Sequence, residues 1–297
     1  MAAVLCAEYH LVAQFLRMHD PASRSWALFL GALPALKLSL SLALACYHAR
    51  KLERQIRHSP RWKQLRAKVQ EYRDLSFGDP EDALKYLTLD YWLRDNIQRA
   101  MQVNVHRRKH LKILDVGCGS GMFAYVCRFW GHEAVGLDKP IAACRPAEAI
   151  VYSVVPETLG VPIKRSMVRA NERLDIKETY DLITAFMICF NQHKQANEWG
   201  PREWKFFLSD AATDLNPGGS VYLAFNRHDE RYGDLQFWDR ETLKLFETCG
   251  DVDCGAGTAM FRREDILRTL GPCPSPLPSL PLNVPPIEIP VPSLSAH

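Results

Sequence analysis

Short apolar runs alternate with longer amphipathic stretches between residues 112 and 262. Seven runs have the length of strands, at 112–116, 133–137, 166–170, 181–185, 220–226, 251–254 and 256–262. Most of the stretches between them repeat their apolar residues at helical spacing, as 122–130 does. Strands that alternate with helices are typical of a parallel sheet with helices on both faces. The pattern therefore predicts a doubly wound α/β domain.

Two amphipathic segments precede this region. Residues 51–72 repeat apolar positions at helical spacing among many Lys and Arg side chains, which predicts a basic amphipathic helix. A Gly-Asp-Pro turn at 78–80 follows, and residues 81–103 predict a second helix. We therefore expect a helical extension at 49–110 in front of an α/β domain at 111–270.

The first 48 residues are dominated by one apolar stretch, 26–47, whose only charge is Lys37. It is long enough to span a bilayer, but a central lysine costs roughly 3 kcal/mol there and offsets most of the gain from the leucines. Three interpretations stay open: a buried or poorly ordered N-terminal helix, a membrane anchor and a secretory signal. The basic residues at 50–68 favour an anchor with the domain on the cytoplasmic face, whereas the nearly neutral N-terminus disfavours a signal.

The composition is that of a chain that mostly folds. Of the 297 residues, 47% are hydrophobic and 24% are charged, which excludes a wholly disordered chain and a polytopic membrane protein. The nine cysteines include no Cys-x-x-Cys pair, which predicts reduced thiols in a cytoplasmic protein and no metal site. Residues 271–297 hold nine of the 19 prolines and are expected to form a disordered tail.

The net charge of +3 is distributed unevenly along the chain. Residues 50–68 contain eight Lys or Arg and one acid, Glu53, whereas residues 69–297 carry a net charge of −5. Affinity for nucleic acid comes mainly from a positive surface that neutralises phosphates, so no DNA partner is expected for the main body. If the chain binds a membrane surface, residues 26–68 are expected to make that contact.

Chemistry is concentrated after the first predicted strand, in the sequence Asp115-Val-Gly117-Cys-Gly119-Ser-Gly121. A strand that enters a glycine-rich turn and then a helix lets a ligand approach bare N–H groups and the positive end of the helix dipole. Asp138 ends the next strand, where a carboxylate can accept both hydroxyls of a ribose. The dinucleotide fingerprint would require glycine at position 122, where Met stands.

This glycine pattern resembles motif I of the class I S-adenosylmethionine-dependent methyltransferases. The resemblance continues in order through 136–138, 180–185 and 215–223, and it covers about 94–262. It implies a mostly parallel, seven-stranded Rossmann-like sheet, S-adenosyl-L-methionine as cofactor and methyl transfer as the activity.

The resemblance also implies roles for single residues. Gly117, Gly119 and Gly121 would cradle the methionine and ribose parts of the cofactor. Asp115 would orient the loop, and Asp138 would bind the ribose hydroxyls.

Two further positions follow from the order of the strands. The family often has an acidic-polar pair after the third strand that contacts adenine; the stretch at 169–172 lacks the usual Asp, which leaves Asn171 for this contact. Substrates of open α/β sheets lie beyond the carboxyl ends of the strands. After the fourth strand, Asn191 and His193 are therefore the catalytic candidates, although a solvent-exposed loop is the commoner place for such a histidine. Methyl transfer requires a base only when the acceptor carries a proton.

The acceptor is expected to be a small or lipophilic molecule, because the main body is net acidic and the N-terminal part is apolar and basic. Two alternatives stay open: a catalytically silent binding or scaffold protein on the same fold, and a methyltransferase that acts on RNA or protein. The sequence does not predict an oligomeric state.

Overall fold

The structure is a computed structural model that describes residues 47–72, 83–187, 199–227 and 237–273. Its centre is a sheet of seven strands in the order β3-β2-β1-β4-β5-β7-β6. The strands are β1 (Lys112–Val116), β2 (Glu133–Asp138), β3 (Ile163–Arg165), β4 (Tyr180–Phe186), β5 (Leu215–Ala224), β6 (Asp251–Asp253) and β7 (Thr258–Arg262). The first five strands are parallel, and β7 is antiparallel to both β5 and β6. The predicted doubly wound, mostly parallel α/β fold is confirmed.

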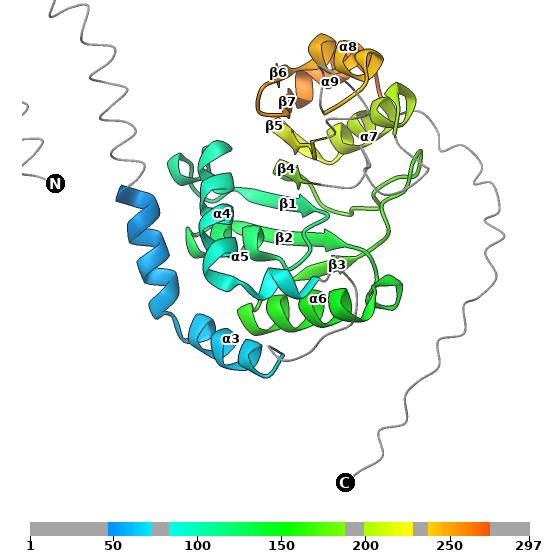
Figure 1. The fold of residues 1–297 in the computed structure, drawn as a ribbon. Helices are drawn as coiled ribbons and strands as arrows, with labels where there is room; N and C mark the ends of the chain where they lie inside the picture. Colours follow the sequence, from blue (N-terminus) through cyan, green and yellow to red (C-terminus); the bar gives the residue numbers. More distant parts are fainter. Residues whose placement is uncertain (1–46, 73–82, 188–198, 228–236, 274–297) are drawn as a thin grey trace, which may run out of the picture.

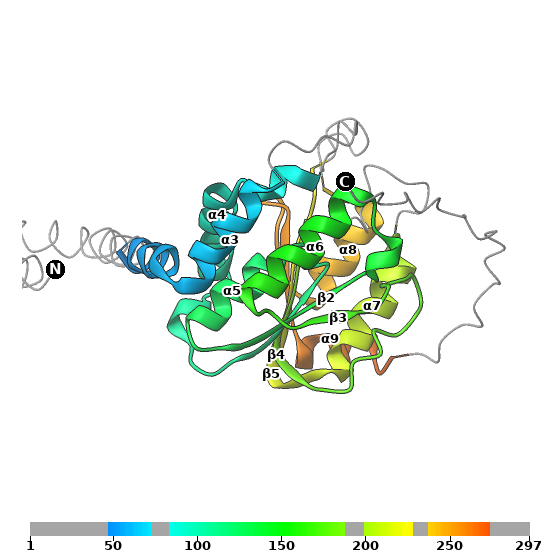
Figure 2. The ribbon, with the colours of Figure 1, turned by 90° about the horizontal axis from the view of Figure 1, so that it is seen from below.

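Helices cover both faces of this sheet (Figures 1 and 2). The α-helices are α3 (Pro60–Gln70), α4 (Leu89–Gln102), α5 (Met122–Phe129), α6 (Pro146–Leu159), α7 (Pro201–Thr213), α8 (Arg240–Cys249) and α9 (Arg263–Leu270). Three short 3-10 helices are η1 (Ala83–Leu87), η2 (Val105–Arg107) and η3 (Ile141–Ala143). Residues 47–58 are also helical.

Two apolar clusters fill the space between the sheet and its helices. One joins β1, β2 and β4 to α4, α5 and α6 and includes side chains of α3 and of the helix at 47–58. The other joins the opposite face of the sheet to α7, α8 and α9. Trp62 and Trp204, each at most 1% exposed, are among the largest side chains of the two clusters. The aromatic segment around Trp204 is thus part of the core.

The N-terminal region departs from the single helix predicted at 51–72. The helix breaks at Ser59, which caps α3 by accepting a hydrogen bond from the Trp62 N–H at 3.3 Å. Pro60 follows at the first position of α3, where its missing N–H is not needed. The second predicted helix, 81–103, is likewise divided into η1 and α4 within the described residues.

The third strand was predicted at the wrong residues. The prediction of 166–170 is corrected to Ile163–Arg165, which pairs with Gly136–Asp138 of β2. This strand lies at the edge of the sheet, and β2 is its one neighbour. Its three residues pair only with the carboxyl half of β2. Short edge strands carry little hydrophobic pattern, which explains the error.

None of the described helices combines the length and the apolar character that a membrane span needs. Residues 26–46 of the apolar N-terminal stretch lie outside the described part of the chain, as does 274–297 of the proline-rich segment. The boundaries predicted at residues 48, 110 and 270 stay predictions.

Candidate active site

The loop after β1 turns sharply at the carboxyl edge of the sheet. Gly117, Gly119 and Gly121 have φ angles of 68°, 53° and 69°, in the left-handed region that glycine adopts without steric cost. The N–H groups of Gly117 and Cys118 donate to the carbonyl oxygen of Leu137, at 2.8 and 3.2 Å, and tie the loop to β2. Helix α5 begins directly after Gly121. The glycine backbone therefore leads directly into the N-terminus of α5, where the first N–H groups of a helix have no partner within the helix.

Asp138 ends β2 beside this loop. Its carboxylate accepts hydrogen bonds from the N–H of Gly119 at 2.5 Å and from the N–H of Lys139 at 2.7 Å. The residue is 8% exposed, and its burial raises the pKa of the carboxyl above the ordinary value although both hydrogen bonds act to lower it. Each carboxylate oxygen has a second lone pair. Asp138 can therefore hold the glycine loop and still accept hydroxyl donors from a ligand.

Asp115 lies under the loop, near the carboxyl end of β1, and is 3% exposed. The hydroxyl of Thr184, on the neighbouring strand β4, donates to its carboxylate at 2.8 Å. Burial raises the pKa of Asp115 to about 7, against the lowering effects of this hydrogen bond and of the Arg99 charge. Burial therefore favours the protonated form of this carboxyl, whereas a cationic group of a ligand would favour the ionised form.

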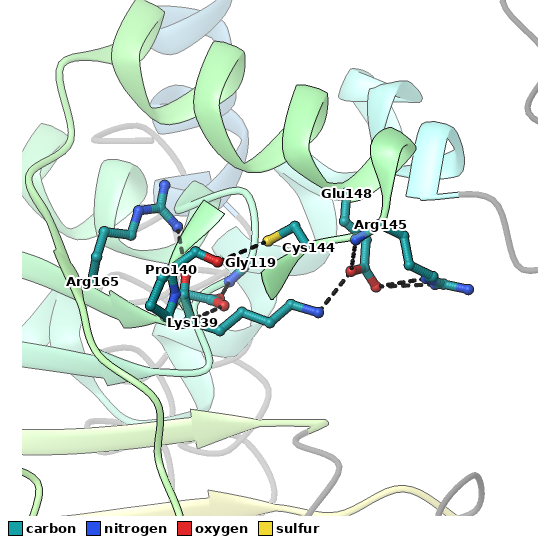
Figure 3. Close-up of polar contacts among 8 residues, drawn as sticks. Gly119, Lys139, Pro140, Cys144, Arg145, Glu148 and Arg165 are labelled. Atoms are coloured by element: carbon teal, nitrogen blue, oxygen red, sulfur yellow. Dashed lines mark hydrogen bonds and ion pairs between the residues drawn. The ribbon is translucent and has the colours of Figure 1, made fainter. Parts of the chain in front are cut away.

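The segment that follows Asp138 is fixed by charged side chains (Figure 3). The ammonium group of Lys139 pairs with the carboxylate of Glu148 at 2.7 Å, and Arg145 donates to the same carboxylate from the N-terminus of α6. Arg165 of β3 donates to the carbonyl oxygens of Lys139 and Tyr152. These contacts connect the end of β2, the start of α6 and the edge strand β3.

Close packing limits the size of the side chains around the loop. A Cβ on Gly136 would lie 2.4 Å from the Cys118 sulfur and 2.6 Å from the side chain of Ile163, so this position on β2 requires glycine. A Cβ on Gly119 would contact the ring of Tyr152 at 3.4 Å. Burial raises the pKa of the Tyr152 phenol far above its ordinary value, so this side chain is neutral beside the loop.

Aromatic side chains and one arginine gather where β4 ends. The ring of Phe186 lies 5.5 Å from the ring of Tyr222 on β5, and the guanidinium group of Arg99 lies 5.2 Å from the Phe186 centroid. Arg99 also pairs with Asp95 at 2.9 Å. Met187 follows with a φ angle of 53° and is 50% exposed. The chain therefore leaves β4 in a strained, open conformation directly before 188–198.

The structure brings five of the predicted site residues together, namely Asp115, Gly117, Gly119, Gly121 and Asp138. Asn171 is half-buried in the loop after β3, with a left-handed φ angle of 59°, and no described contact joins it to the glycine loop. Asn191 and His193 lie outside the described residues.

The sequence analysis missed several residues of this neighbourhood. Lys139 stands next to Asp138, so the motif itself could have drawn attention to it. Glu148, Tyr152 and Arg99 occupy ordinary helical positions, and only the packing of α4 and α6 on the sheet brings them near the loop. No pattern in the sequence distinguishes them from other polar helix residues.

Comparison with known proteins assigns the family. Residues 86–249, more than half of the chain, match the family of the methyltransferase domain. The chain belongs to this family. The methyltransferase domain uses S-adenosyl-L-methionine as its cofactor, and the residues present fit that group. The fit rests on the bare backbone of the glycine loop and on Asp138, whose buried carboxylate retains lone pairs beside it.

Curated proteins resemble part of this methyltransferase domain. The ubiquinone biosynthesis O-methyltransferase of Rhizobium etli is 26% identical over 114 residues, which are 38% of this chain and 40% of that protein. The protein of the same name from Rhizobium rhizogenes is 28% identical over 116 residues, with the same coverage. The chain thus spans about two fifths of the length of these relatives.

Solved structures resemble the domain at lower identity. SAM-bound CalS10, an amino pentose methyltransferase from Micromonospora echinaspora, is 16% identical with a TM-score of 0.41; the match covers 58% of this chain and 91% of that one. DesVI of Streptomyces venezuelae is 13% identical with a TM-score of 0.42, and the match covers 61% and 98% of the two chains.

Proposed function

We propose that this methyltransferase domain transfers a methyl group from S-adenosyl-L-methionine to a small, lipophilic acceptor. The observation that carries the proposal is the contact between the Gly119 N–H and the Asp138 carboxylate, which joins the glycine loop to the end of β2. In a chain that belongs to the methyltransferase family, this is the expected position for the nucleoside part of the cofactor.

Each residue of the loop has a proposed role. Gly117, Gly119 and Gly121 let the methionine and ribose parts approach the backbone, and Asp138 accepts the ribose hydroxyls. Asp115 orients the loop through its hydrogen bond with Thr184 on β4.

Asn171 is proposed to contact the adenine, and this role is separable from the roles of the loop. The residue is half-buried after β3 and has an amide that can both donate and accept hydrogen bonds. Its substitution by Ala is expected to weaken cofactor binding less than loss of the Asp138 carboxylate.

The cofactor, when bound, supplies a methyl group on a sulfonium that is already activated for displacement. The protein therefore contributes alignment of the acceptor and exclusion of water more than acid or base chemistry. If the accepting atom carries a proton, a base is needed. Asn191 and His193, in the segment that follows Met187, are the proposed acceptor contacts.

Two observations favour a lipophilic acceptor. Met187, which is apolar and 50% exposed, directly follows the end of β4, where the buried rings of Phe186 and Tyr222 pack together. The curated relatives carry the name ubiquinone biosynthesis O-methyltransferase, and a quinone precursor is an acceptor of this kind. Location on the cytoplasmic face of a membrane would bring the domain to such a molecule. RNA or protein as acceptor, and a silent scaffold, are the alternatives that the experiment below separates.

Calorimetric titration of the full chain with S-adenosyl-L-methionine and with its demethylated product tests the cofactor. We expect micromolar binding, and we expect Asp138→Asn to weaken it on the order of 100-fold because two charge-assisted hydrogen bonds are lost. Asp251→Asn, on the edge strand β6, is the matched control and should bind like the unmodified chain. Absence of binding by the folded chain would contradict the cofactor assignment.

An acceptor screen follows, with lipophilic phenols, RNA and protein as three separate arms. Methylation of phenols that requires the cofactor supports the proposal, whereas activity only on RNA or protein overturns the acceptor class. Cofactor binding without any turnover would favour the scaffold alternative.

A further inference from the structure

The helix at 47–58 and α3 form an outer edge of the molecule (Figure 1). Several of their outward positions are exposed basic residues. Their apolar side chains, such as Leu52, Ile56 and Trp62, face inward and are at most 2% exposed. Five exposed basic residues, which we call the basic face, are Arg50, Lys51, Arg54, Lys63 and Arg66. Arg61 is also exposed, but its guanidinium group donates to the carbonyl oxygen of Leu159 and is not counted among them.

No carboxylate in the described part of the chain neutralises the basic face. The only acid between residues 50 and 68 is Glu53, which is turned inward and pairs with Arg57 at 2.7 Å and with Arg94 at 2.8 Å. Arg57 in turn pairs with Asp90 of α4 at 2.8 Å. The charges of Glu53, Arg57, Asp90 and Arg94 are therefore balanced among themselves, and those of the basic face are left to attract an external anion.

Positive charge is separated from negative charge more strongly here than on an ordinary solvent-exposed helix. Exposed helices usually mix both signs, because acidic residues four positions from a basic one stabilise the helix. Here every exposed charged residue of both helices before Glu71 is positive, while residues 69–297 have a net charge of −5. A surface of one sign on a body of the other orients the molecule toward a large anionic partner.

Two observations select a bilayer over RNA as that partner. The helix at 47–58 directly follows the apolar sequence 26–46, and its first residue, Tyr47, is 45% exposed, as aromatic residues at a membrane interface are. Single-stranded RNA would require several exposed aromatic side chains for base stacking. Among the described residues the only large exposed aromatics are Tyr47 and Tyr91, which are too few for such stacking.

We propose that the basic face binds an anionic lipid bilayer peripherally, through the headgroups of acidic phospholipids. Lys and Arg near such a surface are attracted by its negative potential, and the attraction falls off within a Debye length. The docking depends neither on the cofactor nor on methyl transfer. It would hold the domain at the membrane surface in the orientation that the two helices define.

Sedimentation of the full chain with vesicles tests the proposal. The probes are vesicles of phosphatidylcholine alone and vesicles with 30% phosphatidylserine. We expect binding to the anionic vesicles that 0.5 M salt largely abolishes. The variant Arg54→Gln/Lys63→Gln/Arg66→Gln should weaken this binding on the order of 100-fold, since each basic residue contributes roughly a factor of five.

The matched control removes three exposed charges from the opposite face of the sheet, with Arg202→Gln, Lys205→Gln and Arg240→Gln on α7 and α8. It should bind vesicles like the unmodified chain, and circular dichroism and cofactor binding confirm that both triple variants are folded. Equal binding to neutral and anionic vesicles would assign membrane contact to the apolar segment and overturn the proposal. Retention of anionic-vesicle binding by the first variant would overturn it as well, as would tighter binding of that surface to a homopolymeric RNA than to the vesicles.

Discussion

Asp115 and Asp138 stand near the ends of adjacent parallel strands, yet their surroundings differ. Asp138 receives two backbone N–H groups, whereas Asp115 receives the single hydroxyl of Thr184 and is fully enclosed. Burial raises the pKa of both carboxyls, and that of Asp115 reaches about 7. At the residue scale, ionisation of Asp115 is therefore unfavourable in the free protein, and a cationic ligand group next to it would make ionisation more favourable.

The raised pKa of Asp115 makes stability depend on pH. The folded chain binds this proton more tightly than the unfolded chain, whose carboxyl has a pKa near 3.8. The free energy of unfolding therefore decreases as pH rises from about 4 through about 7 and then levels off. Asp115→Asn carries no charge at any pH, so it should gain about 2 to 3 kcal/mol relative to the unmodified chain between pH 5 and pH 8.

Urea unfolding of both proteins at pH 5 and pH 8, without cofactor, measures this difference. Asp251→Asn, which removes an exposed carboxylate, serves as the control. A difference between Asp115→Asn and the unmodified chain that is the same at both pH values would refute the prediction.

Gly136 is the second position where a single residue decides the geometry. A methyl group there would lie 2.4 Å from the Cys118 sulfur, so Gly136→Ala should destabilise the fold by about 1 to 3 kcal/mol and displace the loop. The added Cys118→Ala substitution removes the sulfur and should recover part of this loss. Denaturant titrations of the two single variants and the double variant give the coupling free energy between positions 136 and 118. Strictly additive changes in the free energy of unfolding would show that the contact with Cys118 does not cause the destabilisation.

At the scale of elements, the N-terminal helices belong to the same core as the sheet. The side chains of Trp62, Leu65 and Val69 lie in one apolar cluster with α4, α5 and α6. Arg61, at the start of α3, donates to the carbonyl oxygen of Leu159 at the end of α6, at 2.7 Å. These contacts imply that α3 supports the helix that flanks the glycine loop.

Trp62→Ala should therefore destabilise the whole domain, by about 3 to 5 kcal/mol, because it leaves a large cavity at a fully buried position. The adjacent Lys63→Ala is exposed and should change stability by less than about 0.5 kcal/mol. Thermal unfolding followed by far-ultraviolet circular dichroism compares the two variants. If Trp62→Ala melted at the same temperature as the unmodified chain, α3 would be an appendage without influence on the core.

The elements also differ in how well their sequences predict them. The predicted bounds of β1 agree with the structure, because its apolar residues Ile113, Leu114 and Val116 are followed directly by the glycine-rich turn. β3 was misplaced, because three residues at a sheet edge carry too little pattern, and its position depends on pairing with Gly136–Asp138. The sequence Ser59-Pro60 is a signal for the start of a new helix, but the apolar spacing on both sides of it predicts one continuous helix.

At the scale of the whole molecule, charge and chemistry occupy different parts of the surface. The glycine loop and Asp138 lie at the carboxyl edge of the parallel strands, and the basic face belongs to α3 and the helix that precedes it. These two helices lie at the outside of the molecule, away from α7, α8 and α9 (Figure 2). A domain that docks through one surface and binds its cofactor at another can do both at once. The two tests proposed above, on vesicles and by calorimetry, should therefore succeed or fail independently.

The sequence by itself determined the fold class and the positions of the glycine loop and of Asp138 at the ends of neighbouring strands. These depend on short-range rules: strand length, glycine spacing and the fixed place of a carboxylate at the end of the next strand. Only the tertiary structure decided that Asp115 is enclosed with a raised pKa, that Glu148 anchors Lys139, and that Glu53 is turned inward. Burial and charge pairing depend on which surfaces meet when helices far apart in the chain pack on one sheet, and no local pattern records that.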